Sequence, residues 1–280
     1  MDNFHGAAEG IEINVKAAQT KASLSLRRMI VLGMLAGAFI ALGGAASSTA
    51  AFGIDNTGIQ RLVTGVVFPV GLMMTVFGGA ELFTGNCLIE IAVLEKKINV
   101  KQLIRNLTVV YFSNLVGSLL IDALLYFSGN LDLGSDLLGA YAIKLAVSKV
   151  SITPVKALTS GILCNVLVCV AILMAASATD AIGKLFSAFF PIFGFVICGF
   201  EHCVANMFYI PIGIMAASNP TYVSLAQTAY GLTAEQISSL TVLNSLNNFI
   251  PVTIGNLIGG IVLVSLPCYL VQKKWKDEDR

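Results

Sequence analysis

Residues 79–86 read GAELFTGN and residues 199–206 read GFEHCVAN, so both segments fit the pattern G-x-E-x-x-x-x-N. Each segment follows a long apolar stretch, and two further matches flank them in the same order. These are Gly33-Met-Leu with Gly161-Ile-Leu, and Asn114-Leu-Val-Gly117 with Asn256-Leu-Ile-Gly259. Three matches in register predict that the chain consists of two repeated halves.

The composition of the chain indicates its broad class. Of 280 residues, 56% are hydrophobic and 12% are charged, and the mean hydropathy is +0.83. Soluble domains carry roughly a quarter charged residues, because their surfaces must face water. The 17 basic and 16 acidic residues give a net charge of +1, which provides no basic surface for nucleic acid. The sequence therefore predicts a polytopic membrane protein.

Six apolar spans approach or exceed the ~20 residues that a helix needs to cross a bilayer. They cover residues 29–51, 62–82 with a weaker continuation to 94, 107–127, 157–176, 185–214 and 249–271. An amphipathic helix is expected over 10–26 and a charged cytoplasmic tail over 272–280. We predict an all-α fold with a single transmembrane channel domain, residues 1–280, whose repeats are 29–127 and 157–271.

The distribution of basic residues predicts the orientation. Six spans place both termini on one side, and only four of the 17 basic residues lie on the other: Arg61, Lys144, Lys149 and Lys156. By the positive-inside rule, both termini are expected in the cytoplasm of a cell whose plasma membrane holds the protein. Three of the four outer cations lie between the third and fourth spans, where a local positive potential would attract anions. Lys149 is the candidate for this role, whereas Lys144 and Lys156 are interpreted as ordinary interfacial lysines.

Three spans per half force the second half to enter the membrane from the opposite face. Inverted repeats of this kind are typical of transporters and channels, whose sites lie near the midplane where matching helices are interrupted. The second and fifth spans are therefore expected to break at the two G-x-E-x-x-x-x-N segments. Half-helices meeting there would direct their N-terminal amides at the centre, which suits an anion.

The interrupted segments carry the polar groups expected at membrane depth, where ionisable residues nearly always face a cavity or a partner. Glu81, Glu201, Asn86 and Asn206 are interpreted as structural groups that cap or hydrogen-bond the broken backbone. Asn114 and Asn256 are assigned to helix packing, and Glu90 and Asp122 receive no role. His202 is the only histidine in the membrane region and ordinarily titrates near neutrality, so it is the candidate functional group.

Catalysis and metal binding find no support in the sequence. The six cysteines include no C-x-x-C pair and mostly lie in apolar runs, as buried hydrophobes do. There is no G-x-S-x-G elbow and no H-E-x-x-H motif. We therefore predict a protein that is not an enzyme and that has neither a cofactor nor a metal.

The two repeated segments and residues 250–259, IPVTIGNLIG, resemble the formate/nitrite transporter family, and the resemblance covers nearly the whole chain. It implies a homopentamer in the lipid bilayer whose protomers have an aquaporin-like fold and one pore each. It also implies passage of small monovalent anions of weak acids, such as formate, nitrite or hydrosulfide. A hydrosulfide channel is a suggested relative, although the motifs do not specify the substrate.

The resemblance also assigns roles to individual residues. His202 matches the central pore histidine, and Thr84 matches the threonine that shares its loop. Asn165 and Lys149 match a polar pair at the outer vestibule. Leu82 and Phe83 match the apolar gate residues of the loop that holds Thr84. Two hydrophobic constrictions above and below the histidine are matched by four positions: Phe68, Leu72, Val168 and Phe195. Without the resemblance, apolar side chains such as these indicate only packing.

These assignments predict that an anion loses its hydration at one constriction, gains a hydrogen bond or a proton near His202, and crosses the second as a neutral acid. A bare ion would be far more costly there. A proton-coupled symporter remains an alternative. An aquaporin-type facilitator for neutral solutes is another, although its two Asn-Pro-Ala boxes are missing and Asn-Pro occurs once, at Asn219.

Overall fold

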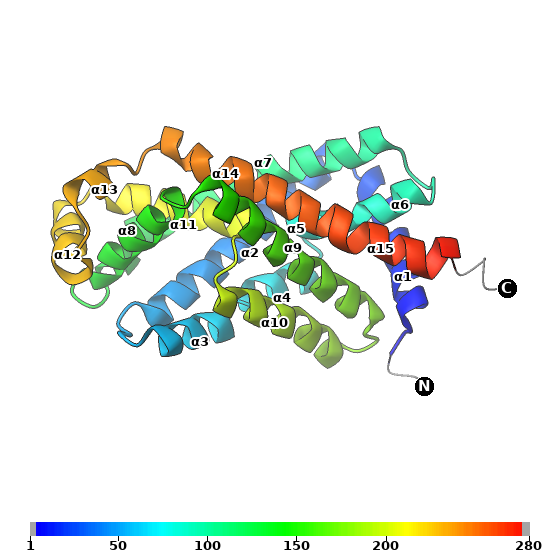
Figure 1. The fold of residues 1–280 in the computed structure, drawn as a ribbon, viewed down its shortest axis with the longest axis horizontal. Coiled ribbons are helices and arrows are strands. Elements are labelled where there is room, and N and C mark those ends of the chain that lie inside the picture. The colour runs from blue at the N-terminus through cyan, green and yellow to red at the C-terminus, as the bar shows by residue number, and fades with distance from the viewer. Residues whose placement is uncertain (1–3, 276–280) are drawn as a thin grey trace.

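The computed structural model describes residues 4–275, and within them helices account for nearly the whole chain (Figure 1). The first half contains α1 (Ala7–Ser23), α2 (Leu26–Ala51), α3 (Thr57–Val67), α4 (Val70–Phe77), α5 (Phe83–Asn86), η1 (Cys87–Ile89), α6 (Glu90–Leu94), α7 (Val100–Phe127) and η2 (Asn130–Asp132). The second half contains α8 (Leu137–Val150), α9 (Pro154–Ser177), α10 (Ala181–Cys198), α11 (Cys203–Ala216), α12 (Pro220–Tyr230), α13 (Ala234–Ser238), α14 (Val242–Leu257), η3 (Ile258–Ser265), α15 (Leu266–Tyr269) and η4 (Leu270–Lys274).

Six helical segments are long and apolar enough to cross a membrane, as the sequence predicted. They cover residues 26–51, 57–77, 100–127, 154–177, 181–198 and 242–274. The stretch expected as one long fifth span is two helices, α10 and α11, joined by residues 199–202. The second span is divided in the same way, between α4 and α5. Both expected breaks are therefore present.

Capping groups explain why several helices start earlier than the hydrophobic runs do. The third span begins at Val100, not at 107, because Asn99 and Gln102 form a capping box ahead of the apolar residues. The amphipathic helix α1 covers 7–23, not 10–26, and α2 starts after Ser25, which accepts a hydrogen bond from the Arg28 amide. Hydropathy locates the membrane, whereas caps define the ends of a helix. The end of the predicted tail, residues 276–280, lies outside the described residues.

Glycines hold together the two helix pairs that form the scaffold. In the first half, a Cβ at Gly37 or Gly117 would collide with the backbone of Asn114 or Met34 across the α2–α7 contact. In the second half, a Cβ at Gly255 or Gly259 would collide with the carbonyls of Leu158 and Ile162 across the α9–α14 contact. The matched glycines Gly117 and Gly259 are thus positions where two backbones touch, which no larger residue allows.

The two repeats place their extra helices at opposite ends of the long axis. In Figure 1, α1 lies beside the C-terminal helix at the right-hand end, whereas α8, α12 and α13 lie at the left-hand end. Lys273 of η4 pairs with Glu12 of α1 at 3.2 Å and with Glu95 at 3.3 Å, which ties these segments together. Between the two ends, the broken helices surround an apolar core, and this core contains the candidate site.

Candidate functional site

Both helix breaks start with a glycine in the left-handed region. Gly79 has φ +59° and Gly199 has φ +71°, a conformation that other residues adopt only under strain. After each glycine the chain turns back, with the Ala80 amide donating to Thr75 O and the Phe200 amide donating to Phe195 O. The backbone beyond these turns is extended and then re-enters a helix at residue 83 or 203. The spacing that the two segments share therefore encodes one backbone shape, which the chain builds twice.

One asparagine clamps each break to the scaffold. Asn256 donates to Gly161 O at 2.7 Å and to Glu201 O at 3.0 Å, and it accepts from the Cys203 amide at 2.9 Å. Asn114 makes the same three bonds in the first repeat, with Gly33 O, Glu81 O and the Phe83 amide as partners. Both asparagines are fully buried. They do join helices, as predicted, but they also satisfy the broken backbone, which is the cap role expected of other residues.

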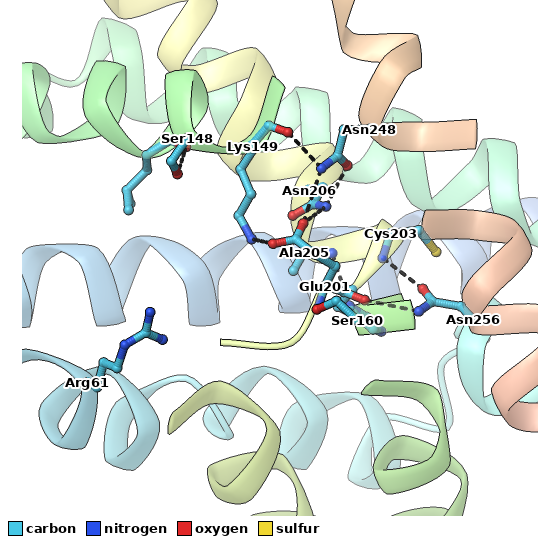
Figure 2. A network of polar contacts seen from close by, with 12 residues as sticks. Arg61, Ser148, Lys149, Ser160, Glu201, Cys203, Ala205, Asn206, Asn248 and Asn256 are labelled. Carbon is cyan, nitrogen blue, oxygen red and sulfur yellow. Dashed lines mark hydrogen bonds and ion pairs between the residues drawn. The ribbon is translucent and has the colours of Figure 1, made fainter. Parts of the chain in front are cut away.

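The two glutamates are ion-paired and do not cap a half-helix, contrary to the prediction. Glu201 accepts from Lys149 Nζ at 2.6 Å, from Asn206 Nδ2 at 2.7 Å and from Asn248 Nδ2 at 3.2 Å (Figure 2). Asn206 also donates to Asn248 Oδ1 at 2.7 Å. In this network of the second repeat, one cation and two amides neutralise the Glu201 carboxylate, whose residue is 6% exposed.

The first repeat contains a matching network. Lys21 Nζ lies 3.2 Å from Glu81 Oε1 and donates to Asn86 Oδ1 at 2.7 Å. Asn86 in turn donates to Glu81 Oε2 at 2.7 Å and to Asn106 Oδ1 at 2.8 Å. The two networks differ in one respect, because Asn206 Oδ1 is buried without a partner, whereas Asn86 Oδ1 binds the lysine. The only carboxylate or amide that the Lys149 ammonium contacts among the described residues is therefore Glu201, whereas the Lys21 ammonium contacts both Glu81 and Asn86.

His202 lies where the two breaks meet. It is the N-cap residue of α11, and its Nδ1 accepts a hydrogen bond from the Ala205 amide at 3.0 Å. Its Nε2 lies 2.8 Å from Thr84 Oγ1 at the start of α5, and both side chains are buried. Because Nδ1 is an acceptor, the network assigns the proton of the neutral ring to Nε2, which donates to Thr84. Thr84 and His202 therefore do not share one loop, as the sequence suggested, but meet across the two breaks in a direct contact between the repeats.

Apolar side chains fill the space around this pair. Phe68 and Phe195 meet edge to face with ring centroids 5.9 Å apart, and Phe195 lies 5.9 Å from the His202 ring. All six predicted gate and constriction residues belong to one buried cluster and are at most 4% exposed: Phe68, Leu72, Leu82, Phe83, Val168 and Phe195. The structure therefore brings the predicted constriction residues together as one apolar plug.

A cavity approaches the plug from each end of the molecule. The first, here the Lys149 cavity, has a volume of about 260 Å³ and is lined by Arg61, Lys149, Glu201 and His202, with Phe68 and Phe195 from the plug. The second, here the Lys21 cavity, has a volume of about 450 Å³ and is lined by Lys21, Glu81, Lys184 and Leu82. Leu72, Phe83 and Val168 line neither, so they occupy the interior of the plug.

Asn165 is not where the sequence placed it. It is fully buried on α9, where its Nδ2 donates to Asn256 O at 2.6 Å and contacts Cys87 Sγ at 3.4 Å. It lines neither cavity, and the partner of Lys149 is Glu201. The residue points at α14 because the close glycine contact between α9 and α14 sets the rotation of α9. Asn165 therefore supports the Asn256 clamp and does not pair with Lys149.

Three network residues were missed: Lys21, Asn106 and Asn248. The signal was present, since Asn106 and Asn248 each lie eight residues before the clamp asparagine of their repeat. Lys21 and Lys149 each lie twelve residues before the matched glycines, Gly33 and Gly161. The repeat is therefore longer than the apolar spans in which it was sought. Among residues 4–275, no three His, Cys, Asp or Glu side chains gather closely enough to hold a metal ion.

Comparisons with known proteins agree with this architecture. The family described as "Formate/nitrite transporter" matches residues 8–270. The "Probable formate transporter" of Methanothermobacter thermautotrophicus is 36% identical, over 94% of this chain and 95% of the relative. "Formate channel FocA" of Escherichia coli strain K12 is 38% identical, over 94% of this chain and 92% of the relative.

Two solved structures share the fold. One, "Pentameric formate channel with formate bound", superposes with a TM-score of 0.77 at 32% identity, covering 88% of this chain and 97% of that one. The other, "FNT family ion channel", has a TM-score of 0.79 at 27% identity, covering 94% and 98%. Neither superposition leaves a large part of either chain unmatched.

Proposed function

This chain belongs to the formate/nitrite transporter family, and from that premise we propose that it passes small monovalent anions of weak acids across a cell membrane. Formate, nitrite and hydrosulfide are the candidate substrates, and formate is the first to test because two relatives and one solved structure are described by it. The proposed assembly is a homopentamer with one pore in each protomer and both termini in the cytoplasm.

The observation that carries this proposal is the His202–Thr84 contact between two cavities. Each cavity brings a lysine–glutamate pair to the edge of the plug, and the plug itself consists of apolar side chains packed around this one polar pair. A path along this line would be too apolar for a bare ion, whose desolvation costs many kcal/mol. A small neutral acid would cross at a far lower cost.

The hydrogen bonds of His202 constrain how a substrate would gain its proton. The neutral ring has one N–H, on Nε2, and giving it up would leave an imidazolate, which is too basic to form here. Uptake of a second proton at Nδ1 would break the bond from the Ala205 amide and uncap α11. We therefore propose that the proton comes from water in a cavity. His202 Nε2–H and the Thr84 hydroxyl then offer hydrogen bonds to the substrate.

In this mechanism the lysine–glutamate pairs limit how tightly an anion binds beside the plug. A lone buried lysine would bind the anion and hold it, whereas a lysine paired at 2.6 Å or 3.2 Å presents little net charge. The pair offers an anion a hydrogen-bond donor without a deep electrostatic well. Release on the far side is then as easy as entry, as conduction requires.

The test is flux into proteoliposomes that contain the purified pentamer. We expect formate, nitrite or hydrosulfide to enter faster than into empty liposomes, with a rate that rises as the pH falls toward the substrate's own pKa. Flux of glycerol or water without any anion flux would overturn the proposal in favour of a neutral-solute facilitator. A proton-coupled symporter differs in accumulating the anion against its gradient when a proton gradient is imposed.

A His202→Asn variant tests the site itself. Asparagine is a good N-cap and can still accept from the Ala205 amide, so the fold is expected to survive. It places no N–H at the position of Nε2, so selectivity among the three anions is expected to change. An intact pentamer with wild-type selectivity would remove His202 from the mechanism.

A further inference from the structure

Arg61 lies at the entrance of the Lys149 cavity, where a hydrogen bond to the end of α10 holds its side chain. Its Nη1 donates to Ile197 O at 3.3 Å, in the last turn of α10, and its side chain is otherwise exposed along the cavity wall. A Cβ on Gly199 would collide with the same guanidinium nitrogen. Figure 2 shows Arg61 on α3 and Lys149 on α8 approaching the cavity from opposite sides. The glycine of the break therefore also makes room for the arginine.

Arg61 is the uncompensated charge of this cavity. Lys149 and Glu201 cancel each other at 2.6 Å. Arg61 forms no ion pair with any carboxylate of residues 4–275. The other polar groups at the entrance, Thr57, Gln60 and Ser148 among them, carry no charge. Among the side chains that line the cavity, the net positive charge thus comes from Arg61 and not from the lysine beside the histidine. Lys144, which also forms no ion pair within the described residues, lies outside this lining with its Nζ 5.5 Å over the Tyr141 ring.

The Lys21 cavity repeats this arrangement with Lys184. Lys184 is the fourth residue of α10 and lines the cavity, as Arg61 is the fifth residue of α3 and lines the other. Lys184 also forms no ion pair within the described chain, whereas Lys21 is bound to Glu81. Each is followed by a Phe-Pro pair, at 68–69 and 190–191. Asp180, one turn away, caps the Gly183 amide and weakens the field of Lys184.

We propose that Arg61 and Lys184 are the anion-capture residues of the two cavities, and that the paired lysines are not. This proposal rests on the proposed function and assigns the capture of the anion and its passage to the plug to different residues. The unpaired cation at each entrance raises the local concentration of the anion, and the paired lysine passes it to the plug. In water, one unit charge at about 5 Å raises the concentration of a monovalent anion about fourfold.

The test is anion flux in proteoliposomes with electrolyte added to one side only. Sodium gluconate is added outside or inside, and sucrose balances the osmotic pressure. Because about 1 M salt shortens the screening length to about 3 Å, wild-type flux is expected to fall when salt is added on either side. Arg61→Gln should lower flux about fourfold at low salt and abolish the response to salt on its own side only. Lys184→Gln should abolish the response on the opposite side, with a smaller loss.

Matched controls separate capture from folding and from general surface charge. Arg61→Lys keeps the charge but loses the guanidinium fork, so it should retain the salt response. Lys156→Gln and Lys101→Gln remove exposed lysines that line neither cavity, and their flux should equal the wild-type value.

Two outcomes would overturn the inference while leaving the proposed function intact. One is a conducting wild-type protein whose Arg61→Gln variant keeps its flux and its salt response on both sides. The other is a control variant that loses as much as Arg61→Gln does. A wild-type protein that conducts no anion would instead refute the proposed function itself.

Discussion

The Asn256 clamp makes a quantitative prediction about stability. Asn256→Ala removes three hydrogen bonds, with donor–acceptor distances of 2.7, 2.9 and 3.0 Å, from a fully buried side chain. Each bond lost leaves a buried backbone group unpaired, at about 1–3 kcal/mol. Water entering the space left by the truncation can re-pair some of them, so we expect the low end, a loss of about 3 kcal/mol.

The assay is thermal unfolding of the purified oligomer in detergent. At a few degrees per kcal/mol, the melting temperature of Asn256→Ala should fall by about 6–12 °C. Ser118→Ala is the matched control, because the Ser118 hydroxyl is also buried in a membrane helix but has no hydrogen-bond partner. Its removal should leave stability unchanged or slightly raised. An Asn256→Ala oligomer that melts with the wild type would refute the clamp.

Four further predictions concern the Thr84 hydroxyl, the Lys149–Glu201 ion pair, the pH dependence of stability and the orientation in the membrane. Thr84→Ala removes one hydroxyl, worth about 0.5–1.5 kcal/mol, so permeability should change by no more than about tenfold; complete loss of flux would contradict this. Lys149→Met leaves Glu201 buried without its cation and should destabilise the oligomer by about 3–5 kcal/mol, whereas adding Glu201→Gln should restore most of the loss; a double variant no better than the single one would exclude the pairing. Burial and the hydrogen bond to Asp132 raise the pKa of Tyr222, so its contribution to stability is present below the ordinary tyrosine pKa of about 10 and is lost as the pH rises further. Melting curves of Tyr222→Phe should lack this alkaline loss, and an identical alkaline profile would refute it. Finally, a cysteine at Lys274 in a Cys198→Ser background should resist an impermeant thiol reagent in intact cells, and labelling would reverse the proposed orientation.

The features that could be predicted from the sequence are those that the backbone itself demands. Gly79 and Gly199 need a left-handed conformation, Gly117 and Gly259 need backbone contact, and the six spans need apolar length. Such requirements leave the same residue type at the same spacing in both repeats. The breaks, the repeat and the meeting of the two segments could therefore be predicted from the sequence.

The partners of the charged groups could not be predicted in this way. Glu81 and Lys21 are 60 residues apart in the chain, and nothing local indicates that α1 folds back onto the break. The glutamates were accordingly read as caps, which is their usual role at a helix start. Asn165 was misplaced for a related reason, because a matching position does not specify the rotation of a helix about its axis. That rotation is set by the glycine contacts between α9 and α14, so Asn165 faces α14 and not the Lys149 cavity.

The lysines at matched positions extend the repeat unit beyond the membrane spans. Each lies on a separate helix ahead of its half, α1 or α8, so each repeat unit comprises this helix and three spans and has its own lysine–glutamate ion pair. Because three spans cross the membrane an odd number of times, the two units have opposite orientations, and each presents its ion pair to a different cavity. Within the described residues, α12 and α13 have no counterpart between α6 and α7, so the second unit alone carries them.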